Sequence, residues 1–236
     1  MGIRRGEITT KIVSDGLVFN MDPANRSCYP KTGTTATDTI NSLSGSLINQ
    51  TSFNDSNFGV WELDGIDDVI SCEGFNLDTT FSMNIWVNND DATFSFRTFI
   101  ASPHYHESGF NGNWVFRATN NASIAFASYD GTSGEEFDTA VVSTMAAGTW
   151  YNLSCTCDGS NLSMYQNGVF KGSFSHTKDL LDTTHGLFIG GEQPGHGTDH
   201  NGEWDGKISC VQIYNRALSA EEVLSNYNGL RGRFGV

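Results

Sequence analysis

The stretch WELDGIDDVI, residues 61–70, places four carboxylates within seven residues. Asp64-Gly65 favours a tight turn, because Asp accepts hydrogen bonds from nearby backbone and Gly tolerates positive φ. The β-branched Val69 and Ile70 that follow are typical of a strand. We therefore interpret the stretch as a turn leading into a strand, with two chemical alternatives: a catalytic carboxylate pair and a metal site.

Strand patterns continue downstream of this turn. Apolar residues alternate with others in TFSMNIWV (80–87) and in ASIAFASY (122–129), and this period of two predicts half-buried strands. In the second strand Ile124, Phe126 and Ser128 share one face. Both stretches are therefore expected to place one face on a core.

Two further turns predict a three-stranded meander over residues 150–174. Asn167-Gly168 is the pair preferred in a type I′ hairpin turn, and Asp158-Gly159 turns a second pair of strands. Within this meander Leu153, Cys155 and Cys157 point to one face, so both thiols are expected in the core. The five cysteines have no metal-ligand spacing, and we expect them to be reduced and buried.

The composition supports one packed β domain. The chain has 236 residues, 38% hydrophobic and 17% charged, which excludes a disordered chain. Its 26 Gly against 4 Pro, with no linker or internal repeat, favours short strands joined by tight turns. We therefore predict an all-β fold, a two-sheet antiparallel β-sandwich (jelly roll) with one short C-terminal helix.

The helix is predicted in LSAEEVLSNYNGL, residues 218–230. Ser219 is a good N-cap, and Glu222 three residues later completes a capping box. Asn228-Gly229 is expected to stop the helix after about two turns.

In order and spacing, these blocks resemble the concanavalin A-like lectin/glucanase superfamily, in its laminin-G/pentraxin-like branch. Residues 15–38, 61–71, 80–88, 148–169 and 187–228 carry the resemblance. It implies a sandwich over residues 15–228, with an N-terminal arm at 1–14 and a C-terminal tail at 229–236. Members of the superfamily bind glycans, often through Ca²⁺, cut glucans, or act as structural modules.

The opening block and the terminal GLRGRFGV also resemble versions of this domain in virion proteins of tailed bacteriophages. That resemblance implies a phage capsid decoration protein on the virion surface, assembled in the host cytoplasm. Its partners would be the major capsid protein or other virion proteins, and a homo-oligomer is compatible with this role. The alternatives are a carbohydrate-binding lectin, a tail-fibre adhesion module and, third, a glycan hydrolase.

Charge restricts the partners. The net charge of −14 argues against nucleic acid as a partner. No stretch is apolar enough for a signal peptide or a membrane span. The basic residues at the two ends are candidates for docking onto a virion: Arg4, Arg5, Lys11, Arg231 and Arg233.

A glycan site needs exposed aromatic rings beside polar groups that bind hydroxyls. The loops at 102–114 and 192–205 offer both, provided that they lie at the same rim. The candidates for contact with host or environmental glycans are Tyr105, Trp114, His196, Asp199 and Trp204. The alternative for the two tryptophans is that they plug the edges of the sandwich, since Trp is usually buried.

For catalysis, residues 62–67 resemble the Glu-x-Asp-x-x-Glu strand of retaining glucanases of the superfamily. Asp67 is one methylene shorter than the Glu required there, and Gly65 invites a turn that breaks the shared face. We therefore expect no catalytic residues and no enzyme.

For a metal, Asp64, Asp67 and Asp68 offer oxygen ligands, but Ca²⁺ takes about six or more. Many relatives have Gly-x-Ile-Asp-Glu in the closing block, where this chain has Ser209 and Cys210 in place of the two acids. We therefore expect no cofactor and no metal site, and Ca²⁺ is the one metal left open.

Overall fold

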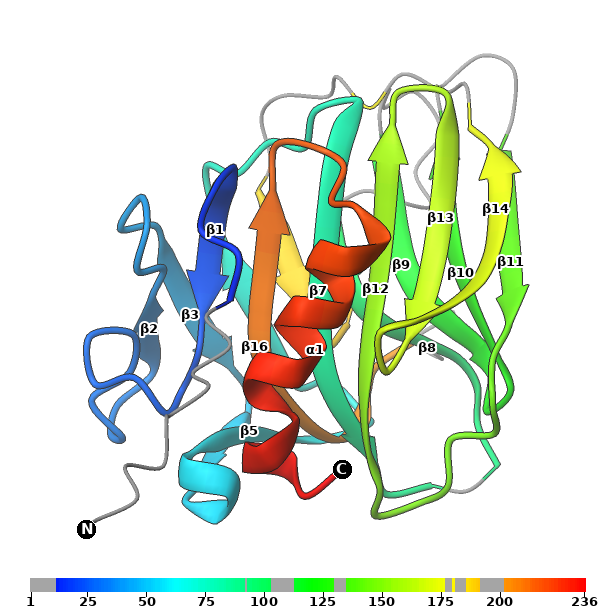
Figure 1. The fold of residues 1–236 in the computed structure, drawn as a ribbon. Coiled ribbons are helices and arrows are strands. Elements are labelled where there is room, and N and C mark those ends of the chain that lie inside the picture. The colour runs from blue at the N-terminus through cyan, green and yellow to red at the C-terminus, as the bar shows by residue number, and fades with distance from the viewer. Residues whose placement is uncertain are drawn as a thin grey trace, which may run out of the picture.

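The computed structural model describes residues 12–91, 93–102, 113–129, 135–176, 180, 186–191 and 202–236. Two antiparallel sheets pack face to face, and a C-terminal helix lies across the outside of one of them (Figure 1). The predicted β-sandwich with one C-terminal helix is confirmed. None of the helices in the described ranges has the length and apolar character needed to cross a membrane.

Sheet A is the sheet that the helix covers. Its strands, in spatial order, are β14 (Val169–Ser175), β13 (Asn161–Gln166), β12 (Trp150–Asp158), β7 (Thr80–Asn89), β16 (Asp205–Tyr214), β5 (Val60–Asp64) and β4 (Ser52–Asn54). Strand β1 (Leu17–Met21) also pairs with β16, so the first and last strands of the chain lie side by side.

Sheet B packs against the inner face of sheet A. Its strands, in spatial order, are β11 (Glu135–Val141), β10 (Ser123–Tyr129), β9 (Asn113–Asn120), β8 (Ser95–Ala101), β15 (Leu187–Ile189), β6 (Val69–Cys72), β3 (Ser44–Ile48) and β2 (Thr35–Thr37). A short 3₁₀ helix, η1 (Ser56–Phe58), precedes β5.

The predicted meander is confirmed as β12, β13 and β14. Asn167 and Gly168 both adopt positive φ, at 53° and 74°, as a type I′ turn requires. Leu153, Cys155 and Cys157 lie in the main core between the sheets. All five cysteines are free and buried, and burial raises the pKa of the Cys28 thiol to about 11.

The strand predicted over residues 80–87 is confirmed as part of β7, but the prediction that it is half-buried is wrong. Strand β7 is buried at every position from Phe81 to Asn89, on both faces. The inner face packs into the sandwich, while the outer face lies under the helix, where Trp86 stacks on Phe234 with ring centroids 4.3 Å apart. The alternating pattern does not reveal that the helix also buries the outer face of β7, because Asn84 and Asn88 on that face are polar.

Helix α1 (Ala220–Phe234) begins at the predicted N-cap. The Ser219 side chain accepts a hydrogen bond from the Glu222 N–H, and the Glu222 side chain accepts one from the Ser219 N–H, so the capping box is present. Arg216 donates two hydrogen bonds to the Glu222 carboxylate and lowers its pKa to about 2.

The predicted end of this helix, at Asn228-Gly229, is wrong. The helix continues to Phe234, through most of the residues expected as a tail at 229–236, and its C-cap is Gly235, which adopts the left-handed conformation with φ 74°. The two glycines inside the helix, Gly229 and Gly232, cost about 1 kcal/mol each. The burial of Phe234 against Trp86 and Trp150 offsets that cost.

Candidate functional site

The turn between β5 and β6 carries the acids of the quoted stretch, and its geometry is that of a structural turn. Gly65 has φ 71°, and Asp64 Oδ1 accepts a hydrogen bond from the Ile66 N–H at 2.9 Å. This turn moves the chain from sheet A to sheet B. The interpretation as a turn that leads into a strand is therefore confirmed.

Asp68 is the buried member of this group, with 2% of its surface exposed. Its carboxylate accepts hydrogen bonds from the backbone N–H groups of Gln50 at 2.7 Å and Asp64 at 3.1 Å. Burial raises the pKa of Asp68; the Gln50 N–H opposes that rise, and the nearby charges of Asp64 and Asp67 add to it. This carboxylate ties the turn to the chain after β3.

The same acids are a candidate for a cation. One oxygen from each of Asp64, Asp67 and Asp68 lies within 4.8 Å of the others. Both oxygens of Asp68 already accept backbone hydrogen bonds, and so does Oδ1 of Asp64. Three carboxylates fall short of the roughly six oxygens of a Ca²⁺ shell, and the expectation of no metal site, with Ca²⁺ left open, stays untested.

The glucanase-like spacing does not form one catalytic face. Glu62 lies within β5, where its carboxylate contacts Lys207 and accepts a hydrogen bond from Asn54. Asp67 lies beyond the end of β5, in the turn that follows Gly65. A retaining glycosidase needs two carboxyl groups facing one cleft, and the turn separates these two.

The structure corrects the glycan-contact role of both candidate tryptophans. Trp114 is 3% exposed and stacks on Phe126, while Trp204 is fully buried against Phe94 and Phe99. Neither ring has a free face for a sugar. Both rings lie in the main core cluster, which agrees with the alternative that they are buried but does not place them at the edges of the sandwich.

The two predicted glycan loops also leave from opposite ends of the sandwich. Strand β15 runs antiparallel to β8, with Phe188 opposite Ala101. The chain therefore enters the 102–114 segment at one end and leaves β15 towards the 192–205 segment at the other. Most residues of both loops lie outside the described residues, so whether the two loops share one rim stays untested.

The remaining candidates divide into two groups. Tyr105, His196 and Asp199, and the basic residues Arg4, Arg5 and Lys11, lie outside the described residues. Of the C-terminal pair, Arg231 is exposed on α1 and keeps its place as a docking candidate.

Arg233 is engaged inside the protein, which corrects its docking role. Its side chain is 11% exposed and donates to the Asp22 carboxylate at 2.7 and 2.9 Å. It also donates to the backbone oxygens of Asn57 and Gly59, both at 2.6 Å. A guanidinium with these partners fixes the end of α1 to sheet A and is not available to a partner protein.

Ser128, His176 and Asp138 form a hydrogen-bonded chain in the order seen in serine hydrolases. Ser128 Oγ lies 3.2 Å from His176 Nε2, and His176 Nδ1 lies 3.0 Å from Asp138 Oδ2. Ser128 shares the inward face of β10 with Phe126 and has no exposed surface. Because a nucleophile must reach its substrate, we assign this chain to packing between β10, β11 and the end of β14.

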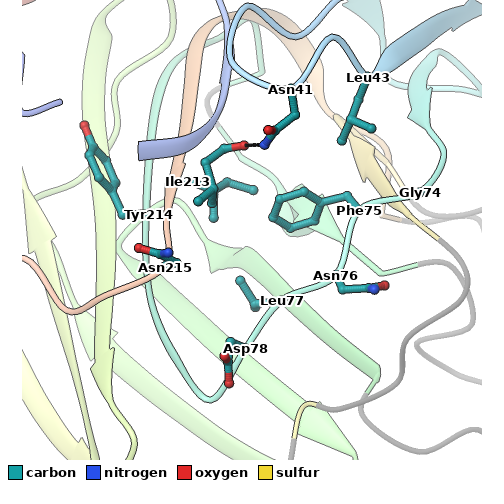
Figure 2. Close-up of a pocket in the computed structure, with 11 residues that line it drawn as sticks. Asn41, Leu43, Gly74, Phe75, Asn76, Leu77, Asp78, Ile213, Tyr214 and Asn215 are labelled. Atoms are coloured by element: carbon teal, nitrogen blue, oxygen red, sulfur yellow. Dashed lines mark hydrogen bonds between the residues drawn. The ribbon is translucent and has the colours of Figure 1, made fainter. Parts of the chain in front are cut away.

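A cavity of about 330 Å³ lies beside the start of β1 and the end of β16, where the loops before β3 and before β7 meet them. We call it the Phe75 cavity. Its lining residues are Val18, Asn41, Leu43, Gly74, Phe75, Asn76, Leu77, Asp78, Ile213, Tyr214 and Asn215 (Figure 2). None of the predicted site residues lines it.

The floor of the Phe75 cavity is apolar. Phe75, Leu77 and Ile213 are almost fully buried, and Val18 and Leu43 are partly buried beside them. Figure 2 shows the Tyr214 ring directed away from the cavity. Its hydroxyl donates to the Val13 carbonyl at 3.0 Å and accepts from Asn226 at 3.0 Å, so Tyr214 contributes only backbone here.

The polar rim of the cavity consists of Asn41, Asn76, Asp78 and Asn215, all exposed. Asn41 Nδ2 donates to the Val18 carbonyl at 2.7 Å, which fixes the orientation of its carboxamide (Figure 2). Oδ1 of Asp78 accepts hydrogen bonds from the backbone and hydroxyl of Thr79, while Oδ2 has no partner among the described residues. The rim therefore presents amide groups and one carboxylate oxygen to a ligand.

A buried carboxylate positions this rim. Asp38 is fully buried and accepts hydrogen bonds from the backbone N–H groups of Asn20 at 2.7 Å, Ile40 at 3.2 Å and Asn41 at 2.6 Å. These bonds hold the 38–41 turn against β1. Asp38 is thus a positioning residue for Asn41.

One local signal for this cavity is present in the sequence. In Phe75-Asn76-Leu77-Asp78 the apolar residues are buried and the polar ones exposed, although no strand forms there. The partner loop that carries Asn41 comes from a distant segment. It reaches the cavity because β3 pairs with β6, with Gly45 opposite Cys72, and no local pattern reveals that pairing.

Solved structures share this fold. Domain 4 of AbnA, a GH43 extracellular arabinanase from Geobacillus stearothermophilus in complex with arabinotriose, matches with a TM-score of 0.68 at 15% identity, over 89% of this chain and 98% of that chain. The binding domain of botulinum neurotoxin serotype D matches with a TM-score of 0.66 at 16% identity, over 91% of this chain and 52% of that chain. The chain thus spans about half the length of that toxin domain, and these identities show the fold alone.

Sequence comparison identifies the family. No significant match was found among curated proteins. A family model for the concanavalin A-like lectin/glucanases superfamily matches residues 64–224, which is more than half of the chain. The match runs from the last residue of β5 into the first half of α1 and includes strands of both sheets, but it leaves out β1 to β4. The chain therefore belongs to the concanavalin A-like lectin/glucanase superfamily.

Proposed function

We propose that this protein is a non-enzymatic carbohydrate-binding module and that the Phe75 cavity holds the sugar. The observation that carries the proposal is the pairing of an apolar floor with a polar rim of three amides and one carboxylate. Ligand pockets combine an apolar lining with a few placed polar groups that fix orientation. A sugar ring presents the matching surfaces, with C–H groups on its faces and hydroxyls around its edge.

Each lining group has a part in this proposal. Phe75 and Leu77, which are 7% and 4% exposed, form an apolar floor that offers the C–H face of the sugar only a narrow contact, so the rim amides provide most of the binding. Amides accept and donate hydrogen bonds, so Asn76 and Asn215 suit hydroxyls in either role, and the fixed Asn41 carboxamide costs little ordering entropy on binding. The arabinanase domain with this fold was solved with arabinotriose, and the toxin domains are named as binding domains, which supports a binding role.

The test is a glycan array with the wild-type protein and the double variant Asn76→Ala/Asn215→Ala. Both amides are exposed, so the variant should fold normally. We expect wild type to retain a sugar and the variant to lose about tenfold or more in affinity, because each hydrogen bond contributes about 0.5–1.5 kcal/mol. The matched control is Gln50→Ala, which removes an exposed amide beside the Asp64–Asp68 turn and should bind like wild type.

Two outcomes would contradict this proposal. If no glycan binds the wild-type protein, the binding role fails. If the retained glycan is cleaved, with new reducing ends that disappear in Glu62→Gln, the non-enzymatic assignment fails.

The role as a capsid decoration protein on virions remains a separate proposal. Arg231 is exposed and available for it, whereas Arg233 is engaged by Asp22. Co-purification of the chain with intact virions at a constant ratio would support this role. Absence of the chain from virions would contradict the decoration role and would leave the glycan-binding proposal unaffected.

A further inference from the structure

We infer that the Phe75 cavity is specific for an uncharged sugar residue at the end of a glycan chain and that Asp78 excludes acidic sugars. This inference rests on the proposed function and names its ligand class. It follows from the charge, the size and the surroundings of the cavity.

Charge is the first step. Among the 11 residues that line the cavity, Asp78 is the one with a charged side chain. Thr79 holds Oδ1 of its carboxylate from the backbone N–H at 2.7 Å and from the hydroxyl at 3.2 Å. The free oxygen accepts a hydrogen bond from a sugar hydroxyl but repels a carboxylate or sulfate placed at the same point.

The surroundings do not cancel this charge. Arg216 follows Asn215, but its guanidinium is paired with the carboxylates of Glu222 and Asp15. Glu73, which precedes Gly74, adds a second exposed negative charge just outside the lining. The whole chain carries a net charge of −14, so its long-range field also disfavours anions.

Size is the second step. A volume of about 330 Å³ is near the lower limit of ligand pockets, which span roughly 300–1,000 Å³. A cavity of this size suits one sugar ring better than a chain of rings. A single sugar ring enters the cavity without the adjoining sugars of its glycan only when it is the terminal residue of a glycan chain or branch.

The experiment is a calorimetric titration with paired methyl glycosides. The neutral probes are the methyl glycosides of glucose, galactose and mannose, and each acidic probe is the corresponding uronic acid. We expect wild type to prefer a neutral probe over its acid by about tenfold or more, since two like charges about 4 Å apart repel by about one to a few kcal/mol near a protein surface.

Two variants locate the cause. Asp78→Asn keeps the shape of the side chain and removes its charge, so the preference should fall to about threefold or less. Glu73→Gln removes the same charge from a residue outside the lining and is the matched control, which should lower the preference much less than Asp78→Asn does. Equal loss of preference in both variants would assign the effect to general charge and overturn the role of Asp78.

A third arm tests the terminal position. The preferred hexose is offered as the internal unit of a trisaccharide, where we expect at least about tenfold weaker binding than at the chain end. Equal binding of neutral and acidic probes, or of internal and terminal units, overturns this inference while the array result still supports a glycan-binding module. If no neutral probe binds although the array detects a glycan, the ligand class is wrong and the binding role stands.

Discussion

Two loops flank the four-residue strand β6, and they behave in opposite ways. The loop at 65–68 and its neighbour Asp64 carry three aspartates, whose buried member Asp68 has hydrogen-bond partners for both oxygens. The loop at 73–79 carries fewer acids, yet it forms much of the Phe75 cavity and leaves polar groups open on its rim.

This difference teaches that a high density of carboxylates does not by itself mark a binding site. Asp and Gly gather in the first loop because a sharp turn between two sheets needs side chains that bond to backbone. In the second loop the polar side chains are exposed beside a hollow with an apolar floor. A candidate site is thus better recognised by open hydrogen-bonding groups next to a cavity.

The largest effect should come from removing the buried carboxylate of the first loop. Asp68→Ala leaves the N–H groups of Gln50 and Asp64 without their partner, and we expect the free energy of unfolding to fall by about 3 kcal/mol. Urea denaturation measures this change. Asp67→Ala is the control, because Asp67 is exposed and should change stability by less than about 0.5 kcal/mol. Similar values for both variants would remove the distinction between the two aspartates.

The glycines of the two loops offer the next comparison, because both adopt the same left-handed conformation. Gly65 has φ 71° and Gly74 has φ 77°. A Cβ on Gly65 would lie 2.7 Å from Asp205 Cβ, whereas a Cβ on Gly74 would meet nothing closer than Leu43 at 3.8 Å. We expect Gly65→Ala to cost about 3 kcal/mol and Gly74→Ala about 1 kcal/mol in unfolding free energy. Equal costs would mean that the first loop has room to move.

A smaller stability effect is expected at Asp78 in the second loop, on the rim of the proposed sugar site. Asp78→Asn should change the free energy of unfolding by less than about 0.5 kcal/mol, because Asp78 is exposed and bonded only to Thr79. Thermal unfolding in the absence of sugar measures this. A loss as large as that of Asp68→Ala would make Asp78 a structural residue like its counterpart.

The smallest effect concerns pH. The pKa of Asp68 in the folded protein lies above its usual 3.8, so the folded state holds the proton more tightly and the free energy of unfolding falls as pH rises above 3.8. Removing a nearby negative charge with Asp67→Asn should recover up to about 0.5 kcal/mol at pH 7 and almost nothing at pH 3. Urea denaturation at the two pH values checks this, and an equal gain at both would exclude the charge as the cause.

Much of the fold could be predicted because its signals are local. The Asn167-Gly168 hairpin, the Ser219 capping box and the Asp64-Gly65 turn each depend on neighbours in the sequence, and all three are present. The end of α1 could not be predicted in this way. It depends on Arg233 reaching Asp22, a partner at the other end of the chain.

The candidate site was predicted least well, for the same reason. Tryptophan is a residue type that can stack on a sugar ring. Whether Trp114 and Trp204 are exposed depends on how the two sheets pack, and both are in the core. Asn41 and Asp78 come together only through the pairing of β3 with β6 and the packing of β1 against β16. Residue type alone identifies the chemistry of such a site and leaves its position open.

The position of β16 has a consequence for how the protein is made. This strand, residues 205–214, lies between β5 and β7 in sheet A and also pairs with β1. A ribosome that synthesises the chain from its N-terminus therefore produces β1, β5 and β7 long before the strand that joins them. Until then their edges are open to other chains, so we expect the nascent chain to need protection from aggregation until residues 205–214 have been made.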